Sequence, residues 1–201
     1  MTAVDPSPAG LVVLGCSWGG LDAVGRVLSD LPADADCAVV VVQHRPQSDS
    51  PLAAFWRSSA HWPVTEPEDK EPLCTGRVYV APAGYHLMIE ADHLALSTEG
   101  PYHHSRPSID VLFESAASSW GAREVAVVLT GANSDGAAGA ARVAAAGGRV
   151  VVQDPAEAAR AEMPAAALAA VPEADVLALS AIGAHVGDLV GSRSRSEPAR
   201  P

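Results

Sequence analysis

The segment LVVLGCSWGG, residues 11–20, contains the pattern that decides the fold. Its apolar run predicts a β-strand at 11–15 that is buried on both faces. The glycines after the run allow a tight turn, and the residues that follow predict a helix at 20–31 that stops at Pro32. A buried strand that turns through glycines into a helix is typical of a parallel α/β sheet.

The same alternation of strand and helix continues to the end of the chain. The run CAVVVVQ predicts a second buried strand at 37–43. Further strands are expected at 124–130, 149–153 and 175–179, and further helices at 51–59, from about 108, at 135–146, at 164–170 and at 182–190. Between 63 and 100, short apolar runs broken by turn residues predict an antiparallel ribbon. The expected fold is α/β: a doubly wound, mostly parallel sheet with helices on both faces and a small antiparallel hairpin insertion.

Length and composition are those of one domain. A chain of 201 residues, 48% of them apolar, can bury one substantial core. We assign residues 11–191 to this domain and residues 1–10 to an N-terminal extension. The polar, proline-containing residues 192–201 are expected to form a disordered tail.

Charge, hydropathy and cysteine content exclude several classes of protein. The net charge of −11 argues against nucleic-acid partners and against binding to anionic membranes. Cys16, Cys37 and Cys74 are odd in number and show no paired spacing, so neither a disulfide framework nor a zinc site is expected. The chain has no apolar run long enough to span a bilayer and does not begin like a signal peptide. We expect a cytoplasmic protein without membrane insertion, metal or cofactor.

Three chemically capable side chains follow predicted strands. Ser17 lies in a G-x-S-x-G turn, His44 comes directly after the strand at 37–43, and Asp135 follows the strand at 124–130. The carboxyl ends of parallel strands meet at one edge of a sheet, so these side chains are expected there together. A serine nucleophile needs a base, and the base needs an acid that fixes its tautomer. The pattern indicates a Ser-His-Asp hydrolase, with N–H groups of the following helix available to a developing oxyanion.

Other interpretations of the same edge stay open at this point. Taken one at a time, each residue also has a plainer interpretation. Ser17 suits a phosphate-binding or structural turn, His44 an ordinary loop histidine, and Asp135 a helix N-cap. A dinucleotide site would use Gly15, Gly19 and Gly20, but it needs an acidic residue at the end of the second strand, where this chain has Gln43. A cysteine enzyme would use Cys16, whose position before the turn directs its side chain back into the strand–helix junction.

Five segments, taken together, resemble the catalytic domain of the CheB-type chemotaxis protein-glutamate methylesterases. They are GCSWGG, VVQHRP, RVYVAPAGYHLMI, HSRPSIDVLFESAA and VVLTGANSDGAAG, which occur in the family's order and spacing. The family fold is a doubly wound parallel sheet with a small antiparallel hairpin, in agreement with the expectation above. The resemblance implies that Ser17 is the nucleophile, His44 the general base and Asp135 its orienting acid.

The resemblance also implies a substrate and a partner. In the family the substrate is a glutamate γ-methyl ester on the helical cytoplasmic part of a chemoreceptor, and many members also deamidate receptor glutamines. We therefore expect a methylated chemoreceptor or another sensory protein as partner. Members that act in chemotaxis commonly carry an N-terminal receiver domain, whereas only about ten residues precede the first strand here. Regulation is accordingly expected from a partner in trans.

Several residues near the expected site differ from the family pattern. Trp18 follows the nucleophile, where a small residue is usual, and is expected to line the cleft. Ala132 stands where methionine is common, at a position that gives a backbone N–H to the oxyanion hole in the family. Asn133 replaces a glycine, and asparagine tolerates the positive φ that glycine adopts. Glu162 replaces a glycine just before Met163, which is expected to line the site.

Arg106 and two of these departures bear on the substrate. Arg106, in the RPS segment, is expected either to bind an acidic receptor helix or to form a structural ion pair. Trp18 and Glu162 leave two alternatives to the methylesterase: a catalytically weakened domain that docks on a signalling partner, and an esterase with a different substrate.

Overall fold

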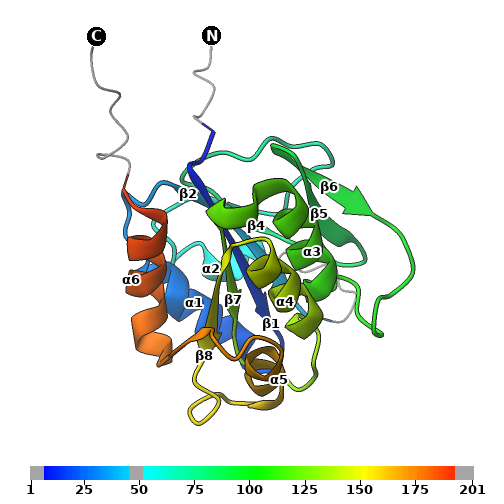
Figure 1. The fold of residues 1–201 in the computed structure, drawn as a ribbon. Coiled ribbons are helices and arrows are strands. Elements are labelled where there is room, and N and C mark those ends of the chain that lie inside the picture. The colour runs from blue at the N-terminus through cyan, green and yellow to red at the C-terminus, as the bar shows by residue number, and fades with distance from the viewer. Residues whose placement is uncertain (1–6, 46–51, 193–201) are drawn as a thin grey trace, which may run out of the picture.

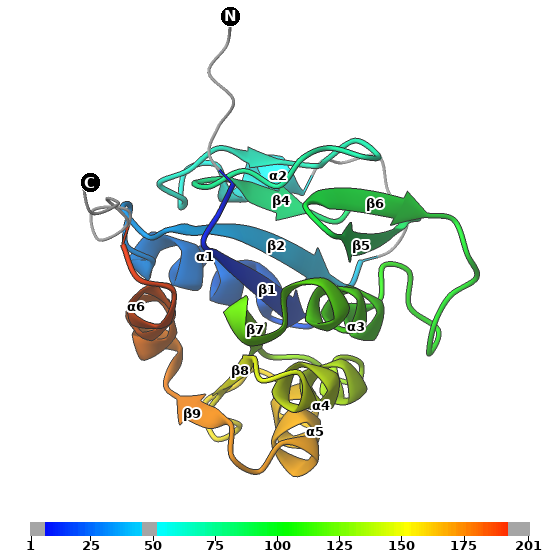
Figure 2. The same ribbon diagram turned by 45° about the horizontal axis from the view of Figure 1, so that its top comes forward.

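A computed structural model describes residues 7–45 and 52–192 of the protein. Within these residues, seven strands form one parallel sheet in the order β3-β4-β2-β1-β7-β8-β9, and two more form a separate antiparallel hairpin (Figures 1 and 2). The strands of the sheet are β1 (Gly10–Cys16), β2 (Cys37–Gln43), β3 (Val64–Thr65), β4 (Val78–Val80), β7 (Glu124–Val128), β8 (Arg149–Gln153) and β9 (Asp175–Leu177). Those of the hairpin are β5 (His86–Glu90) and β6 (His93–Ser97).

Helices cover both faces of the sheet, so the predicted doubly wound α/β fold is confirmed (Figure 2). They are α1 (Gly20–Asp30), α2 (Ala53–Trp56), α3 (Ile109–Trp120), the 3₁₀ turn η1 (Gly121–Arg123), α4 (Ala137–Ala145), α5 (Glu162–Ala170) and α6 (Leu179–Val190). Side chains alternate along β1: Leu11 and Val13 pack with α3, α4 and α5, whereas Val12 and Leu14 pack with α1 and α6. A strand buried on both faces carries a continuous apolar run, as this one does.

The predicted antiparallel ribbon between 63 and 100 is partly wrong. Val78–Val80 pairs in parallel with β2, and Val64–Thr65 pairs in parallel with β4, so both extend the main sheet. Only the hairpin of β5 and β6 is antiparallel. The physical difference is burial: all three residues of β4 are buried, whereas the hairpin mixes buried, half-buried and exposed residues.

The predicted helix at 51–59 is also shorter than expected. A single turn, α2, is formed, and Trp56 at its end is fully buried, with its indole N–H donating to Leu21 O at 2.8 Å. Residue 51 and the predicted tail beyond residue 192 lie outside the described residues. None of the helices in the described ranges is long and apolar enough to cross a membrane.

The strand order places the carboxyl ends of β2, β1 and β7 next to one another. The turn after β1 is tight: Gly19 has φ of 81°, and a Cβ there would come within 2.8 Å of the Cβ of Ala159. This edge of the sheet is therefore closely packed around the loop that carries Ser17.

Candidate active site

The Ser17 loop is fixed by neighbours on both sides. The N–H of Ser17 donates to Thr130 O at 2.9 Å, beyond the end of β7. The carbonyl of Ser17 accepts from the N–H of Gly20, in the turn after β1, at 2.9 Å. It also accepts from the side-chain amide of Gln43, the last residue of β2, at 2.8 Å. The half-buried serine thus occupies a turn whose backbone is tied to both adjacent strands.

His44 lies beside Ser17 across the β1–β2 ladder. Cys16 and Gln43 are the last registered pair of these strands, and His44 N continues the ladder by donating to Cys16 O at 3.0 Å. The residues that follow this pair are Ser17 and His44, on neighbouring strands spaced by about 4.8 Å. Gln43 also donates its side-chain amide to His44 O at 2.8 Å, so one glutamine side chain holds both loops.

Asp135 is buried and accepts four hydrogen bonds. Oδ1 accepts from Ser108 Oγ and Asp110 N, each at 2.9 Å, while Oδ2 accepts from Ile109 N at 2.9 Å and from His44 Nε2 at 2.6 Å. Burial alone would raise the pKa of Asp135, but the hydrogen bonds, that of His44 foremost, outweigh it and hold the pKa below its ordinary value. The ionised carboxylate can only accept, so His44 carries its hydrogen on Nε2 and its lone pair on Nδ1.

The expectation that Asp135 begins and caps its own helix is wrong. Helix α4 begins at Ala137 behind Gly136, which has φ of 96°, and has no side-chain cap. Asp135 instead binds the first N–H groups of α3, and Asp110 of α3 accepts from Gly136 N and Gly139 N at 2.9 and 2.7 Å. The two carboxylates thus cap each other's helices, and burial together with the charge of Asp135 raises the pKa of Asp110 to about 6.

The side chain of Asn133 lies against the base. Its Nδ2 is 3.4 Å from His44 Nδ1. Ser17 Oγ, by contrast, makes no hydrogen bond to any residue in ranges 7–45 and 52–192. The structure therefore brings His44 and Asp135 into contact and places Ser17 beside them without the serine–histidine hydrogen bond.

Trp18 and Met163 occupy different environments beside the Ser17 loop. The indole of Trp18 is 67% exposed, and the guanidinium of Arg160 lies 5.7 Å from its ring centroid. Met163 is buried, its N–H donates to Gly131 O at 2.9 Å, and its side chain fills the space where a Cβ at Gly131 would stand. Trp18 is therefore open to a large partner, whereas Met163 supports the loop from inside.

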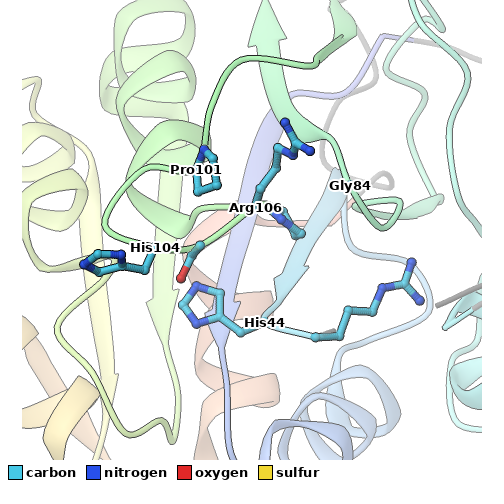
Figure 3. A pocket seen from close by; sticks show the side chains of 8 residues that line it. His44, Gly84, Pro101, His104 and Arg106 are labelled. Carbon is cyan, nitrogen blue, oxygen red and sulfur yellow. The ribbon is translucent and has the colours of Figure 1, made fainter. Parts of the chain in front are cut away.

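A cavity of about 430 Å³ opens beside His44 (Figure 3). It is lined by His44, Arg45, Gly84, Pro101, His104, Ser105, Arg106 and Pro107. Arg106 donates from Nη1 to Thr98 O and Glu99 O, each at 2.9 Å, and forms no ion pair with a described residue. Its position near the cleft and its positive charge suit a substrate that carries negative charge, whereas the other arginine of the lining, Arg45, is paired with Glu66 at 2.8 Å. Ala132 and Glu162, the other predicted site residues, are both exposed.

Several residues that shape this site were not singled out from the sequence. Ser108 and Asp110 bind Asp135 or its helix, and Gln43 holds the loops of Ser17 and His44. Gln153, at the end of β8, accepts from Thr130 N at 2.9 Å. Like Gln43 at the end of β2, it joins its strand to the loop after the neighbouring strand. A polar residue that directly follows a run of buried valines was the available signal for both glutamines.

The alternative site chemistries find little support in the packing. A Cβ at Gly15 would overlap Ile109, and Gly20 packs against Gln43 and Cys16, so these glycines serve close contact within the protein. Cys16 is fully buried with its Sγ 3.1 Å from Gln43 Oε1, and burial raises the pKa of its thiol. No cluster of three potential metal ligands occurs in the described part of the chain.

Comparisons with known proteins find a matching family model and relatives of similar sequence. The model of the CheB methylesterase family matches residues 12–186. A Leptospira interrogans protein, provisionally named protein-glutamate methylesterase/protein-glutamine glutaminase, is 41% identical over 173 residues, which are 85% of this chain and 90% of that protein. The Symbiobacterium thermophilum protein-glutamate methylesterase/protein-glutamine glutaminase is 40% identical over 152 residues, which are 75% of this chain but only 42% of the longer relative.

The fold is likewise similar to a solved structure. The crystal structure of the Thermotoga maritima CheB methylesterase catalytic domain matches with a TM-score of 0.87 at 30% sequence identity. The match covers 90% of this chain and 99% of that domain.

Proposed function

The chain belongs to the CheB methylesterase family and is a protein-glutamate methylesterase; from this premise we propose that it works through Ser17, His44 and Asp135. The proposed substrate is a glutamate γ-methyl ester on the cytoplasmic helices of a chemoreceptor, with receptor glutamine amides as a second substrate. The observation that carries the proposal is the 2.6 Å contact between His44 Nε2 and the ionised Asp135, beside the Ser17 loop.

The proposed reaction has two steps, acylation of Ser17 and hydrolysis of the acyl-enzyme. Ser17 Oγ attacks the ester carbonyl while His44 Nδ1 accepts its proton, and Asp135 stabilises the imidazolium. The tetrahedral intermediate expels methoxide, which takes the proton from His44 and leaves as methanol. Water then attacks the acyl-enzyme with His44 again as base, which releases glutamate and restores Ser17. The N–H groups of Ala132, an exposed residue, and of the residues just after Ser17 are the proposed donors to the oxyanion.

The lining of the cavity supports an acidic protein substrate. Arg106 and His104 line it from the segment after β6 (Figure 3), although the chain as a whole carries a net charge of −11. The guanidinium of Arg106, which pairs with no carboxylate in the described part of the chain, attracts a helix rich in glutamate. We place this reaction in the cytoplasm, with any regulatory partner acting in trans.

The activity is tested on a receptor cytoplasmic fragment methylated by a methyltransferase from the same organism. Mass spectrometry of the fragment follows the loss of one methylene mass per ester and the conversion of glutamine to glutamate. We expect both changes with the wild type, neither with His44→Gln, and unchanged activity with His61→Gln, an exposed histidine on the far side of α1 that serves as the matched control. Demethylation by His44→Gln at the wild-type rate would refute the proposed base.

One observation favours the second candidate, a docking domain with weakened catalysis. Ser17 Oγ has no hydrogen bond to His44 in the described structure, and Asn133 takes the position against Nδ1. In that case the wild type binds the methylated fragment but demethylates it no faster than Ser17→Ala does. The same mass-spectrometric assay, combined with a binding measurement, separates the two candidates.

A further inference from the structure

We propose that the Asn133 side chain competes with Ser17 for the lone pair of His44 Nδ1 and so lowers the reactivity of the serine until a receptor helix covers the site. The inference rests on the proposed function, because it takes Ser17 as nucleophile and His44 as its base. It assigns Asn133 the role of a positioning residue that acts through His44.

The orientation of the Asn133 amide follows from its two hydrogen bonds. Its Oδ1 accepts from Asp135 N at 3.2 Å, which leaves Nδ2 directed at His44 Nδ1, 3.4 Å away. The reversed amide would set its NH₂ group against the N–H of Asp135, two donors facing each other. Asn133 is thus held as a donor to the histidine.

His44 can accept that hydrogen bond only on the nitrogen that Ser17 needs. Nε2 donates to Asp135 Oδ2 at 2.6 Å, so the single free lone pair of the neutral ring is on Nδ1. Ser17 must donate its proton to this lone pair before it attacks a carbonyl. The absence of a Ser17 Oγ hydrogen bond across residues 7–45 and 52–192 agrees with a lone pair already in use.

The backbone does not require asparagine at position 133. The sequence predicted that Asn133 replaces glycine at a positive φ, and this prediction is wrong. The described residues other than glycine that have positive φ are Lys70, Ala91, His103 and His104. Asn133 is exposed as well, so neither strain nor packing accounts for it, whereas its two side-chain contacts do.

The exposed position also allows the amide to be displaced. A receptor helix over Ser17 covers Asn133 and offers the amide other partners, which frees Nδ1 for the serine. A small reagent offers no such partners, and its reaction with Ser17 must break the hydrogen bond between Asn133 and His44. Asn133 therefore lowers the reactivity of Ser17 toward small electrophiles by the worth of that bond, about 2- to 10-fold.

The test measures the rate at which diisopropyl fluorophosphate labels Ser17. In this reaction Ser17 Oγ bonds to phosphorus, fluoride leaves, and the serine proton passes through His44 to solvent. Intact-protein mass spectrometry follows one added phosphoryl group in the wild type, Asn133→Ala, Asn133→Asp and Ser17→Ala. The control is Ser134→Ala, a change at the adjacent exposed residue whose side chain makes no hydrogen bond in the described chain.

We expect Asn133→Ala to be labelled about 2- to 10-fold faster than the wild type, and Ser134→Ala at the wild-type rate. Asn133→Asp retains an acceptor for Asp135 N but sets a carboxylate against His44 Nδ1, which favours the protonated imidazole and removes the lone pair, so this variant should be labelled more slowly than the wild type. If Asn133 only supports the loop, Asn133→Ala should instead be labelled more slowly than the wild type, because loss of the hydrogen bond to Asp135 N loosens the loop. Equal or slower labelling of Asn133→Ala overturns the inference and leaves the proposed nucleophile standing. Absence of labelling in every form overturns both.

Discussion

Glu124 is the first residue of β7, at the amino-terminal end of this central strand and opposite the end that faces the active site. The residue is fully buried. Neither oxygen has a hydrogen-bond partner among the described residues. Burial raises the pKa of Glu124 from 4.5 to about 8. The folded protein therefore keeps this carboxyl protonated at neutral pH, whereas the unfolded chain releases the proton.

The sign and size of the effect on stability follow from this difference. Below pH 4.5 both states bind the proton, and between pH 4.5 and about 8 only the folded state does. Unfolding then releases a proton, so stability falls as pH rises, by about 1.4 kcal/mol per pH unit. At pH 7 the accumulated cost is on the order of 3 kcal/mol.

The substitution Glu124→Gln removes the ionisation and retains the shape. We expect the variant to match the wild type near pH 4.5 and to exceed it by about 3 kcal/mol in free energy of unfolding at pH 7. Urea unfolding followed by circular dichroism at pH 4.5, 6, 7 and 8 measures both curves, and the difference between them removes the contributions of other groups. Glu173→Gln, at an exposed residue, should run parallel to the wild type. A constant difference between Glu124→Gln and wild type across this range would refute the reasoning.

Three further changes probe the site and its supports. Asp135→Asn sets an NH₂ group against hydrogen-bond donors and removes the charge that orients His44, so methanol release should fall about 10³- to 10⁴-fold while circular dichroism remains native. Trp18→Ala removes an indole that is 67% exposed, so unfolding free energy should change by less than about 0.5 kcal/mol, while KM for the receptor fragment rises about tenfold at unchanged kcat. Gln43→Met withdraws a donor from the carbonyls of Ser17 and His44, which should lower the unfolding free energy in urea by about 1–3 kcal/mol. Unchanged kcat in the first, unchanged KM in the second or unchanged stability in the third would contradict the corresponding role.

Burial patterns explain which parts of the fold were predictable. The runs at 37–43 and 149–153 are apolar and bounded by polar residues, and both strands have the predicted bounds. Val78–Val80 is too short to show a period, and its pairing depends on where β2 lies in space. The sequence therefore predicted this strand as part of the antiparallel ribbon, whereas it belongs to the parallel sheet.

The site could be predicted to the level of which strand end each residue follows. Asp135 was expected to cap the helix after it, but the neighbouring helix α3 presents its free N–H groups to the same carboxylate. The contact of Asn133 with His44 joins residues 89 positions apart through two loops. Such contacts depend on loop coordinates, which no periodicity in the sequence encodes.

The central claim is that Ser17 performs nucleophilic attack on a protein glutamate methyl ester. The most direct measurement is methanol release from the methylated receptor fragment by the wild type, Ser17→Ala and Ser118→Ala, the last an exposed serine on α3 that controls for the substitution itself. The account predicts release by the wild type and Ser118→Ala and none above background by Ser17→Ala. Release by Ser17→Ala at the wild-type rate would contradict it.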